Sequence, residues 1–358
     1  MKKLGFGLAG LGLGPVSGWA LPQAREASAF PLDLPVRLNA NENPFGPSPA
    51  ARAAMAAAVS QSNRYAWDLS GTLIKALAQK YGIAPENLLL GAGSMDMIDV
   101  VVRAAGLGSG TLVVPSPSFT IWASAATEVG LRKVEVPLTE NKQIDLPAMA
   151  KAIGGDTRLV YICNPNNPTG TVCDSKRLRD FVQSVSRQAM VIVDEAYLDY
   201  TREPSLLSEA VVNEKLVVLK TFSKVYGMAG ARVGYAIGHA KTIRSLSDLL
   251  CWPNGGLGSV SLAGAIASLE DQAFFRESIA RNEEVRRFTA EQLIGRGMVV
   301  IPSQTNFLYF SLANDSGDYF QRLKAAQVLG TGLYEEAGRW TRITIGTMDD
   351  MKRFVLAI

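Results

Sequence analysis

The stretch Met190-Val191-Ile192-Val193-Asp194-Glu195-Ala196-Tyr197 decides the fold, because a run of apolar residues ends there on two acids. Such a run is typical of a strand that is buried on both faces, as in a parallel sheet. An acid at the tip of a buried strand is costly without a cationic partner, although an Asp that caps the next helix is the simpler interpretation. The stretch therefore predicts a strand whose carboxyl end faces either a ligand or a helix.

Further strands and helices alternate on both sides of this stretch. Leu73, Leu77 and Tyr81 are four residues apart, which predicts a helix over residues 69–81, and Asp174 is placed to cap another helix over 175–186. Alternating elements of this kind predict an α/β fold with a mostly parallel sheet flanked by helices. The other β-rich runs are 111–114, 158–163, 216–219 and 233–237.

The character of the sequence changes after Trp252-Pro253-Asn254-Gly255-Gly256. A long helical stretch covers about residues 259–293, and β-like segments follow at 306–311 and 342–345 around a helix at 318–326, which predicts a smaller α/β domain at the C-terminus. We expect four regions. They are a signal peptide at 1–29, an N-terminal arm and a helix that packs on the small domain at 30–62, a large cofactor-binding domain at 63–253, and the small domain at 254–358.

Composition excludes several classes of protein. The 358 residues carry 36 Lys plus Arg against 33 Asp plus Glu, and this near balance gives no general nucleic-acid footprint. Three cysteines cannot form a disulfide framework, and a single histidine, His239, removes His-rich metal sites and most Ser-His-Asp schemes. We therefore expect no metal, and any acid–base chemistry must come from Lys, Tyr, Asp, Glu or a cofactor.

The N-terminus has the pattern of an export signal. Lys2 and Lys3 precede an apolar, Gly-rich run to Ala20, and Ala27-Ser28-Ala29 forms a small-x-small cleavage pattern. We expect a periplasmic or secreted protein without a stable membrane span. The alternatives are that the segment is a lipid-contacting anchor or that the start codon is misplaced. If the segment is not a functional signal, we expect a cytoplasmic protein. The G-x-G-x-x-G match at Gly5–Gly10 is disfavoured as a dinucleotide site, because only four residues precede it.

Two loops after predicted strands are suited to ligand binding. Gly91-Ala92-Gly93-Ser94 opens a helical stretch, and small residues at a helix N-terminus can hold a phosphate, although many such turns simply begin a helix. Asn164-Pro165-Asn166-Asn167-Pro168-Thr169-Gly170 is a rigid turn that leaves its Asn side chains free, unless it is an ordinary Asn-Pro connection. Both lie where open α/β sheets bind ligands.

A third loop, Thr221-Phe222-Ser223-Lys224, brings two hydroxyls and an amine together, with Arg232 further along. Most lysines are solvated, but small and apolar residues surround Lys224, and a desolvated lysine loses its proton readily and can form a Schiff base.

Together these groups fit pyridoxal 5′-phosphate, which needs an amine, an acid at its ring nitrogen, donors to its phenolate oxygen and a phosphate cup. Lys224 would supply the amine, Asp194 the acid, and Asn167 and Tyr197 the donors. Phe119 would offer an apolar face to the ring. The phosphate cup would be formed by Gly91, Ala92, Gly93, Ser94, Thr221, Ser223 and Arg232.

The chain resembles the fold-type I pyridoxal-phosphate aminotransferases, and most closely the histidinol-phosphate aminotransferase group. The resemblance covers residues 38 to the C-terminus and implies a large domain with a mostly parallel, seven-stranded-type sheet. It also implies a transaminase that moves an amino group between an amino acid, or an amino alcohol phosphate, and a 2-oxo acid through a Lys224 Schiff base. The matching strings, in family order, are Leu38-Asn39-Ala40-Asn41-Glu42-Asn43-Pro44, Asn63-Arg64-Tyr65, Gly91–Ser94, Asn164–Gly170, Asp194–Tyr197, Ser223-Lys224 with Arg232, and Arg342-Ile343-Thr344-Ile345-Gly346-Thr347.

The resemblance also implies a homodimer with active sites shared between subunits, in which Tyr65 reaches the partner's cofactor phosphate. Arg342 resembles the arginine that binds the acidic group of the substrate, and Arg353 a second substrate arginine. Asn43 belongs to an arm that covers the substrate. Enzymes of this group often carry another arginine in the stretch that here reads Val328-Leu329-Gly330-Thr331-Gly332. This chain has no arginine there, so the resemblance leaves the substrate open.

Rival interpretations use the same motifs. A pyridoxal-phosphate decarboxylase, an amino-acid oxidase or a cyclase would share the cofactor site and differ in its products. A non-catalytic binding protein on an old enzyme scaffold would not need the full set of Lys224, Asp194 and Arg342.

Overall fold

The computed structural model describes residues 35–315 and 317–358. The predicted signal peptide at 1–29 and the start of the predicted arm lie outside these described residues.

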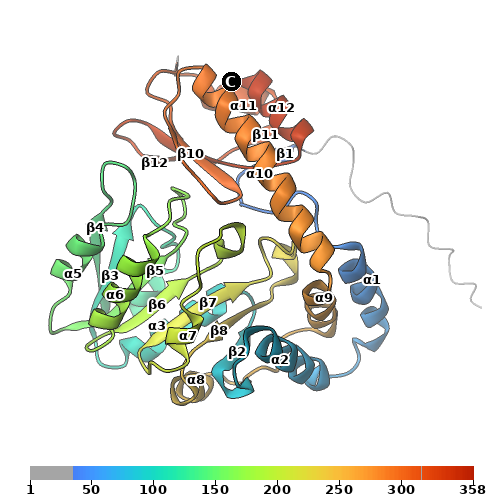
Figure 1. The fold of residues 1–358 in the computed structure, drawn as a ribbon, viewed down its shortest axis with the longest axis vertical. Coiled ribbons are helices and arrows are strands. Elements are labelled where there is room, and N and C mark those ends of the chain that lie inside the picture. Colours follow the sequence, from blue (N-terminus) through green and yellow to red (C-terminus); the bar gives the residue numbers. More distant parts are fainter. Residues whose placement is uncertain (1–34, 316) are drawn as a thin grey trace, which may run out of the picture. The chain divides into compact units, whose positions relative to one another are not determined.

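A seven-stranded sheet forms the centre of the larger part of the molecule (Figure 1). Its strand order is β2-β8-β7-β6-β5-β3-β4, and all neighbouring strands pair in parallel except β8, which is antiparallel to both β7 and β2. The prediction of a mostly parallel sheet is therefore confirmed. The strands are Leu88–Gly91 (β2), Gly110–Ser116 (β3), Leu131–Pro137 (β4), Thr157–Cys163 (β5), Met190–Asp194 (β6), Leu216–Thr221 (β7) and Gly234–Ile237 (β8).

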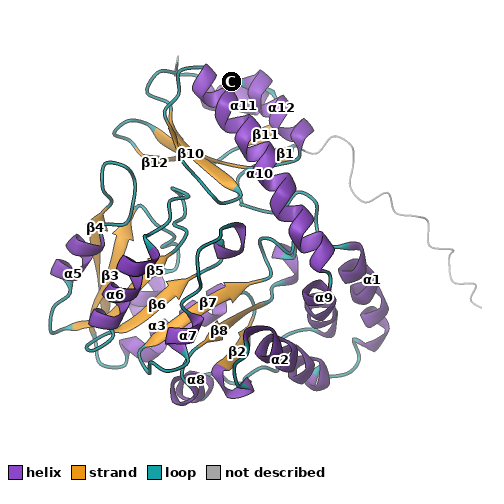
Figure 2. Cartoon of the chain, viewed as in Figure 1, coloured by secondary structure: helices purple, strands orange, loops and turns teal. Residues whose placement is uncertain are grey.

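Helices cover this sheet, and Figure 2 shows its strands lying between them. In α6 (Ser175–Val185) Leu178, Phe181, Val182 and Val185 are buried at helical spacing, and Asp174 accepts a hydrogen bond from the N–H of Arg177, as the sequence predicts for an N-cap. The other helices of this part are α2 (Trp67–Tyr81), α3 (Ser94–Gly106), α4 (Ala123–Glu128), α5 (Leu146–Ala152), α7 (Leu207–Ala210) and α8 (Ala240–Ser247).

A second, smaller sheet follows with the order β12-β13-β10-β9, and all its pairs are antiparallel. It packs with three helices around a core of its own that includes Phe310, Ile343 and Phe354. The prediction of a smaller C-terminal α/β domain is confirmed. Its elements are α10 (Gln272–Gly295), β9 (Val300–Ile301), β10 (Phe307–Ser311), α11 (Tyr319–Ala325), β12 (Leu333–Glu335), β13 (Trp340–Thr344) and α12 (Met348–Ala357).

The N-terminal arm joins this smaller part first. β1 (Val36–Arg37) pairs in parallel with β11 (Val328–Leu329), and Leu38 is buried in the smaller core. The arm then crosses to the larger part, where α1 (Pro49–Ala58) packs on α9 (Ser259–Glu270).

The two hydrophobic cores divide later than the predicted boundary at residue 254. Leu262 and Ala265 of α9 belong to the larger core, whereas the smaller core begins with Val285 in α10. The helical stretch predicted over 259–293 is also broken at Asp271, whose side chain accepts a hydrogen bond from the N–H of Phe274 and begins α10. The change of composition near Pro253 thus marks a loop, not the end of the core.

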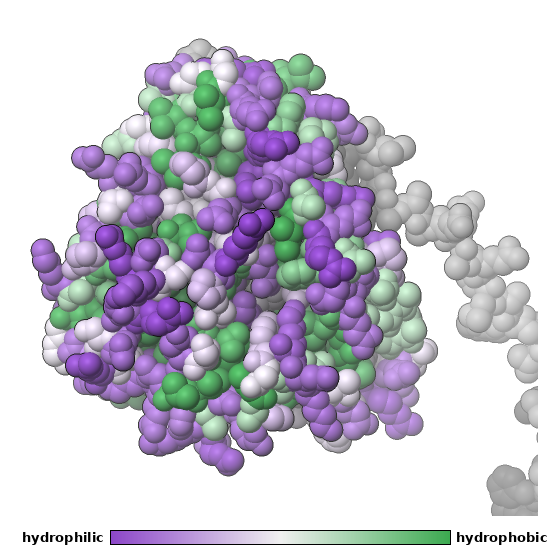
Figure 3. Space-filling model, viewed as in Figure 1, coloured by the Kyte–Doolittle hydropathy of each residue, from purple (hydrophilic) through white to green (hydrophobic). Residues whose placement is uncertain are grey.

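Hydrophilic side chains surround smaller apolar areas on the face that Figure 3 draws. Among the described residues, no helix is both long enough and apolar enough to cross a membrane.

Candidate active site

The loops singled out in the sequence meet at one cavity of about 240 Å³. It lies where β6 ends at Asp194 and β7 ends at Thr221, two neighbouring parallel strands of the large sheet. The carboxyl ends of neighbouring parallel strands lie at the same edge of a sheet, which explains why loops distant in sequence converge here. The lining residues are Ala40, Glu42, Ser94, Met95, Phe119, Cys163, Asp194, Ala196, Tyr197, Thr221, Ser223, Lys224, Ala229 and Arg232.

Asp194 is the buried acid of the cavity, with 2% of its surface exposed. Its Oδ2 accepts a hydrogen bond from the Tyr161 hydroxyl at 3.0 Å, and its Oδ1 accepts one from the N–H of Ala196 at 3.0 Å. Burial raises the pKa of Asp194 to about 6, because desolvation outweighs these two hydrogen bonds and the attraction of the Lys224 ammonium. The carboxylate therefore has capacity for a further, cationic partner.

Lys224 is the amine of the cavity. Its Nζ donates to the carbonyl oxygen of Asn41 at 3.2 Å and lies 5.4 Å from the centre of the Tyr197 ring. The pKa of Lys224 is lowered to about 8, mainly by desolvation on burial and also by the Arg342 guanidinium, while Asp194 opposes the shift. An amine with this pKa is neutral in a substantial fraction of molecules near neutral pH, so it can act as a nucleophile or a base.

Arg232 and two hydroxyls form a cationic cup beside the N-terminus of α3. The Arg232 guanidinium donates to Ser223 Oγ at 3.3 Å and to the carbonyl oxygen of Ala92 at 3.1 Å, and Thr221 Oγ1 donates to Ser223 Oγ at 2.8 Å. Gly93 permits this approach, since a Cβ there would lie 2.2 Å from Arg232 Nη2. Helix N–H groups, hydroxyls and a guanidinium together suit a phosphate.

Tyr197 and Asn167 link this cavity to the smaller domain. The Tyr197 hydroxyl accepts hydrogen bonds from Asn41 Nδ2 at 3.1 Å and Asn167 Nδ2 at 3.4 Å, and Asn167 Oδ1 accepts one from Arg342 Nη1 at 2.5 Å. Burial raises the pKa of Tyr197, while the Arg342 guanidinium opposes that shift. The phenol is therefore a neutral donor at physiological pH.

Arg342 reaches the site from β13 with 6% of its surface exposed. Its Nη2 donates to the carbonyl oxygen of Asn39 at 2.6 Å, and its Nε is buried with no hydrogen-bond partner among the residues that the structure describes. Such a donor normally has an acceptor, so a carboxylate or another anion fits beside it.

Several predicted residues do not line the cavity themselves. Ala92, Gly93, Asn167 and Arg342 contact its lining residues or one another, as described above. Three further predicted residues have their contacts elsewhere. Asn43 is engaged elsewhere, because its Nδ2 donates to the carbonyl oxygen of Val225 at 2.9 Å and so ties the arm to the loop of Lys224. Arg353 is exposed on α12 and its Nε donates to the carbonyl oxygen of Ala326 at 3.0 Å. Tyr65 is 71% exposed and stacks on Trp67.

The structure also adds residues that the sequence analysis does not assign to the site. Glu42 and Ala40 line the cavity from the arm, and Tyr161 supports Asp194 from within β5. The arm was expected to cover the site, which is the signal for Glu42; no local signal distinguishes Tyr161 from other buried strand residues. Within residues 35–315 and 317–358 no group of three His, Cys, Asp or Glu side chains is placed to hold a metal ion.

Pyridoxal 5′-phosphate fits the residues that surround the cavity. Lys224 offers an amine of lowered pKa, Asp194 a buried acid, and Arg232 with Ser223 and Thr221 an anion cup, all in one cavity. Phe119 lines the same cavity and provides an apolar surface.

Comparison with known proteins gives consistent results. The family model of aminotransferase class I and II matches residues 35–358. The chain is 34% identical over 324 residues to histidinol-phosphate aminotransferase 2 of Carboxydothermus hydrogenoformans, covering 89% of each chain. It is 37% identical over 336 residues to an aromatic amino acid aminotransferase of Mycolicibacterium paratuberculosis, covering 90% of this chain and 92% of the relative. The crystal structure of histidinol-phosphate aminotransferase from Sinorhizobium meliloti in complex with pyridoxal-5'-phosphate superposes with a TM-score of 0.83 at 27% identity, covering 90% of this chain and 89% of that chain.

Proposed function

The chain belongs to the class I and II aminotransferases, and from this premise we propose that it moves an amino group from an amino acid to a 2-oxo acid with pyridoxal 5′-phosphate bound at Lys224. The sequence-based prediction of a fold-type I enzyme close to the histidinol-phosphate aminotransferases is confirmed at the level of the family. The decarboxylase, oxidase and cyclase alternatives are not favoured by these relatives.

One observation carries the proposal. A single cavity is lined by Lys224, Asp194 and Arg232, which are an amine, an acid and an anion-binding guanidinium. The cofactor needs these three groups at its aldehyde, its ring nitrogen and its phosphate. A solvent-exposed lysine or a helix-capping aspartate, the simpler interpretations of the sequence, would not have given pKa shifts caused mainly by burial.

When bound, pyridoxal phosphate supplies an aldehyde that joins amines and a protonated ring that accepts electron density from the substrate Cα. Asp194 would hold the proton at the ring nitrogen, because its carboxyl is ionised above a pH of about 6. Asn167 and Tyr197 would donate to the phenolate oxygen, and Arg232, Ser223 and the turn before α3 would bind the phosphate.

Lys224 would be both the attachment point and the base. Once the amine of the substrate has replaced Lys224 at the cofactor, Lys224 Nζ would accept the proton from the substrate Cα. It would then deliver this proton to the cofactor carbon. A pKa of about 8 leaves enough neutral amine for this step near neutral pH.

Arg342 would bind the carboxylate of the amino donor. Its Nε has no partner among the described residues, and its guanidinium is already oriented by Asn167 and by the carbonyl oxygen of Asn39. A two-point contact there would fix which bond at Cα points toward Lys224.

We propose an apolar or aromatic amino acid as the donor, with histidinol phosphate as the second candidate. The guanidinium carbon of Arg342 lies 5.5 Å from the centre of the Phe307 ring and 5.6 Å from the centre of the Tyr334 ring. The stretch 328–332 contains no arginine that could bind a second phosphate. A neutral side chain therefore suits the surroundings of Arg342 better than an anionic one.

We also propose a homodimer with shared active sites, in which Tyr65 of one subunit approaches the phosphate of the other. Tyr65, Trp67 and Trp252 form an exposed aromatic cluster, with 71%, 60% and 45% of their surfaces exposed. Clusters of this kind are typical of protein interfaces. Sedimentation of the loaded protein, compared with the Trp67→Ser and Trp252→Ser double variant, tests the dimer.

Export through residues 1–29 stays a prediction, since this segment lies outside the described residues. Sequencing the N-terminus of the protein recovered from its own cells would decide between a cleaved and an intact chain.

The central test is chemical trapping. Borohydride treatment of the cofactor-loaded protein should leave a pyridoxyl group on Lys224 in peptide mass spectra, and a tag elsewhere or no tag would overturn the proposal.

A second experiment tests the amino donor. Mixing the loaded protein with single amino acids should bleach its visible band, fastest with phenylalanine or tyrosine. Bleaching only by histidinol phosphate would reverse the order of the two donors.

A further inference from the structure

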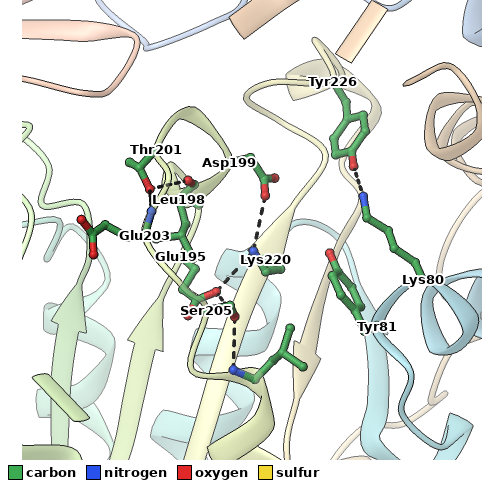
Figure 4. A network of polar contacts seen from close by, with 12 residues as sticks. Lys80, Tyr81, Glu195, Leu198, Asp199, Thr201, Glu203, Ser205, Lys220 and Tyr226 are labelled. Atoms are coloured by element: carbon green, nitrogen blue, oxygen red, sulfur yellow. Dashed lines mark hydrogen bonds and ion pairs between the residues drawn. The ribbon is translucent and has the colours of Figure 1, made fainter. Parts of the chain in front are cut away.

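A group of ion-paired side chains lies at the ends of β6 and β7, next in sequence to residues of the candidate active site; Figure 4 shows these side chains. We call Glu195, Asp199 and Lys220 the buried network. At its centre the ammonium of Lys220 lies 3.3 Å from Glu195 Oε2 and 3.5 Å from Asp199 Oδ1. The side chains of Lys220 and Glu195 are only 5% and 2% exposed. None of these residues lines the cofactor cavity.

Glu195 is held firmly in this network. Its Oε2 accepts a hydrogen bond from Ser205 Oγ at 2.5 Å, and its Oε1 accepts one from the N–H of Leu206 at 2.8 Å. The backbone N–H of Glu195 also donates to the carbonyl oxygen of Leu219 at 2.9 Å, which continues the ladder between β6 and β7. The carboxylate therefore has little freedom to leave Lys220.

Two residues of the network are direct neighbours, in sequence, of residues that line the cavity. Glu195 follows Asp194 directly, and Lys220 directly precedes Thr221. Successive side chains of a strand point to opposite faces, so Lys220 lies on the other face of β7 from Thr221, which lines the cavity. The Lys220–Glu195 pair thus joins the two strand ends that carry the acid and the amine of the site.

A second lysine, Lys80 on α2, contacts the loop that follows Lys224. Its Nζ donates to the Tyr226 hydroxyl at 2.7 Å and lies 5.4 Å from the centre of the Tyr226 ring and 5.4 Å from that of Phe275. Tyr226 is two residues beyond Lys224. Lys80 also feels the charges of Asp199 and Lys220, which act on its pKa in opposite directions.

We propose that Lys220 is a positioning residue for the cofactor site, which neutralises Glu195 and Asp199 and so holds both the geometry and the charge balance behind Asp194 and Lys224. The inference rests on the proposed function, because its target is the cofactor at Lys224. Without the ammonium, Glu195 and Asp199 would lose their cation, and the uncompensated charge of Glu195, which follows Asp194 directly, would hold protons in the cavity more tightly.

The charged and titratable groups that face Lys220 support this balance. They are Glu195 and Asp199 from the turn after β6, and Lys80 and Tyr81 from α2. Burial by itself lowers the pKa of Lys220, but the carboxylates of Asp199 and Glu195 outweigh burial and raise it. The charge of Glu195 also contributes to the raised pKa of Asp194. Lys220 is therefore charged at every physiological pH.

The test is the pH titration of the visible absorption band of the cofactor-loaded protein without substrate, between about pH 5 and pH 10. A unit charge about 10 Å away at an effective dielectric constant of about 20 shifts a pKa by about one unit. In Lys220→Met the midpoint should therefore rise by about one pH unit, because a cation is lost. In Asp199→Asn it should fall by a similar amount, because an anion is lost. Lys220→Arg should keep the midpoint of the unaltered protein.

The opposite signs separate this role from a merely structural one. Loosening of the fold would move both variants in the same direction, and that result would overturn the proposal, as would two unchanged midpoints. If Lys220→Met shows no cooperative unfolding by circular dichroism, Asp199→Asn decides alone, and a midpoint that does not fall overturns the proposal. Lys241→Met is the matched control, since Lys241 pairs with Glu214 on the surface and should leave the midpoint unchanged.

The two proposals fail differently. If the unaltered protein shows neither a visible band nor a borohydride tag on Lys224, the proposed function falls and this inference falls with it. If it shows both, and the midpoints do not move as stated, only the role of Lys220 is overturned.

Discussion

Lys220 and Lys224 lie four positions apart, are both largely removed from water, and have opposite properties. Burial alone lowers the pKa of each side chain. In the buried network Asp199 and Glu195 more than compensate, so the pKa of Lys220 rises. In the cavity the acceptors of Lys224 are backbone carbonyl oxygens, and its pKa falls to about 8. Burial thus makes an amine either permanently charged or reactive, and the neighbouring groups decide which.

The same contrast holds for the whole pair of regions. Charges in the buried network are balanced by protein groups, whereas Asp194 in the cavity and Arg342 beside it keep capacity for further partners. A protein that only needed stability would not keep the second arrangement, since unpartnered buried charge is costly. The difference indicates that the cavity is completed by a ligand.

Replacing each lysine in turn tests whether Lys224 reacts and Lys220 only positions the site, and it has the largest expected effect. Lys224→Ala should lower turnover by about 10⁴-fold or more and abolish the visible band, because both the attachment point and the base are lost. Lys220→Met should lower turnover by about tenfold at most, since a shift of one pKa unit changes a protonated fraction by up to that factor. Steady-state formation of the 2-oxo acid measures both. Comparable losses in the two variants would contradict the distinction.

Two adjacent acids offer a second comparison. Asp194→Ala should lower turnover by about 10² to 10³-fold and weaken cofactor retention, because the ring nitrogen loses its anionic partner. Glu195→Gln keeps the hydrogen bond to Ser205 but removes the charge, and it should leave the cofactor bound. Gel filtration followed by absorbance of the retained cofactor measures the difference. Equal loss of cofactor from both variants would show that the two acids act as one structural unit.

Part of this arrangement could be predicted from the sequence. β6 (Met190–Asp194) and β7 (Leu216–Thr221) are apolar almost throughout, so the sequence pattern predicts both strands. Each strand ends at a residue that lines the cavity. β4 (Leu131–Pro137) was not assigned, because it is an edge strand whose Arg132 and Lys133 face water. β2 (Leu88–Gly91) is only four residues long and resembles the end of the preceding helix-rich stretch.

The contacts around the site were harder to predict from the sequence than the residues that line it. Lys224, Asp194 and Arg232 belong to local motifs, and the structure brings them to one cavity. Glu195 could be assigned to the scaffold, but its pairing with Lys220 depends on the register between β6 and β7, which sequence alone does not give. The resemblance offers both Arg342 and Arg353 as substrate arginines, and only packing shows that the Arg353 guanidinium is directed toward Ala326.

These two arginines give the third comparison. Arg342→Met should raise the KM for the amino donor by about 10 to 100-fold, which corresponds to the loss of a charge-assisted hydrogen bond. Arg353→Met should change KM by less than about twofold, because its guanidinium is exposed and donates to a backbone carbonyl oxygen. Initial rates over a range of donor concentrations measure both values. A large effect of Arg353→Met would restore it as a substrate residue.

The smallest expected effect is on the pH dependence of stability in the cofactor-free protein. The folded pKa of Lys224, about 8, lies below its ordinary value of 10.5. Between these values Lys224 holds a proton in the unfolded chain that it lacks in the folded protein, so its contribution to the free energy of unfolding rises with pH. The slope of this contribution is about 1.4 kcal/mol per pH unit in that window. Below pH 8 the buried ammonium lowers stability.

Lys224→Met should remove this slope, and Lys220→Met should keep it, although the latter protein is less stable at every pH because two acids lose their partner. Urea unfolding at pH 7.5, 8.5 and 9.5, followed by circular dichroism, measures the three slopes. The comparison is between slopes rather than midpoints, so a general loss of stability cannot imitate the result. If Lys224→Met retains the slope, the proton belongs to another group, and the amine of the cavity is not the one that burial makes reactive.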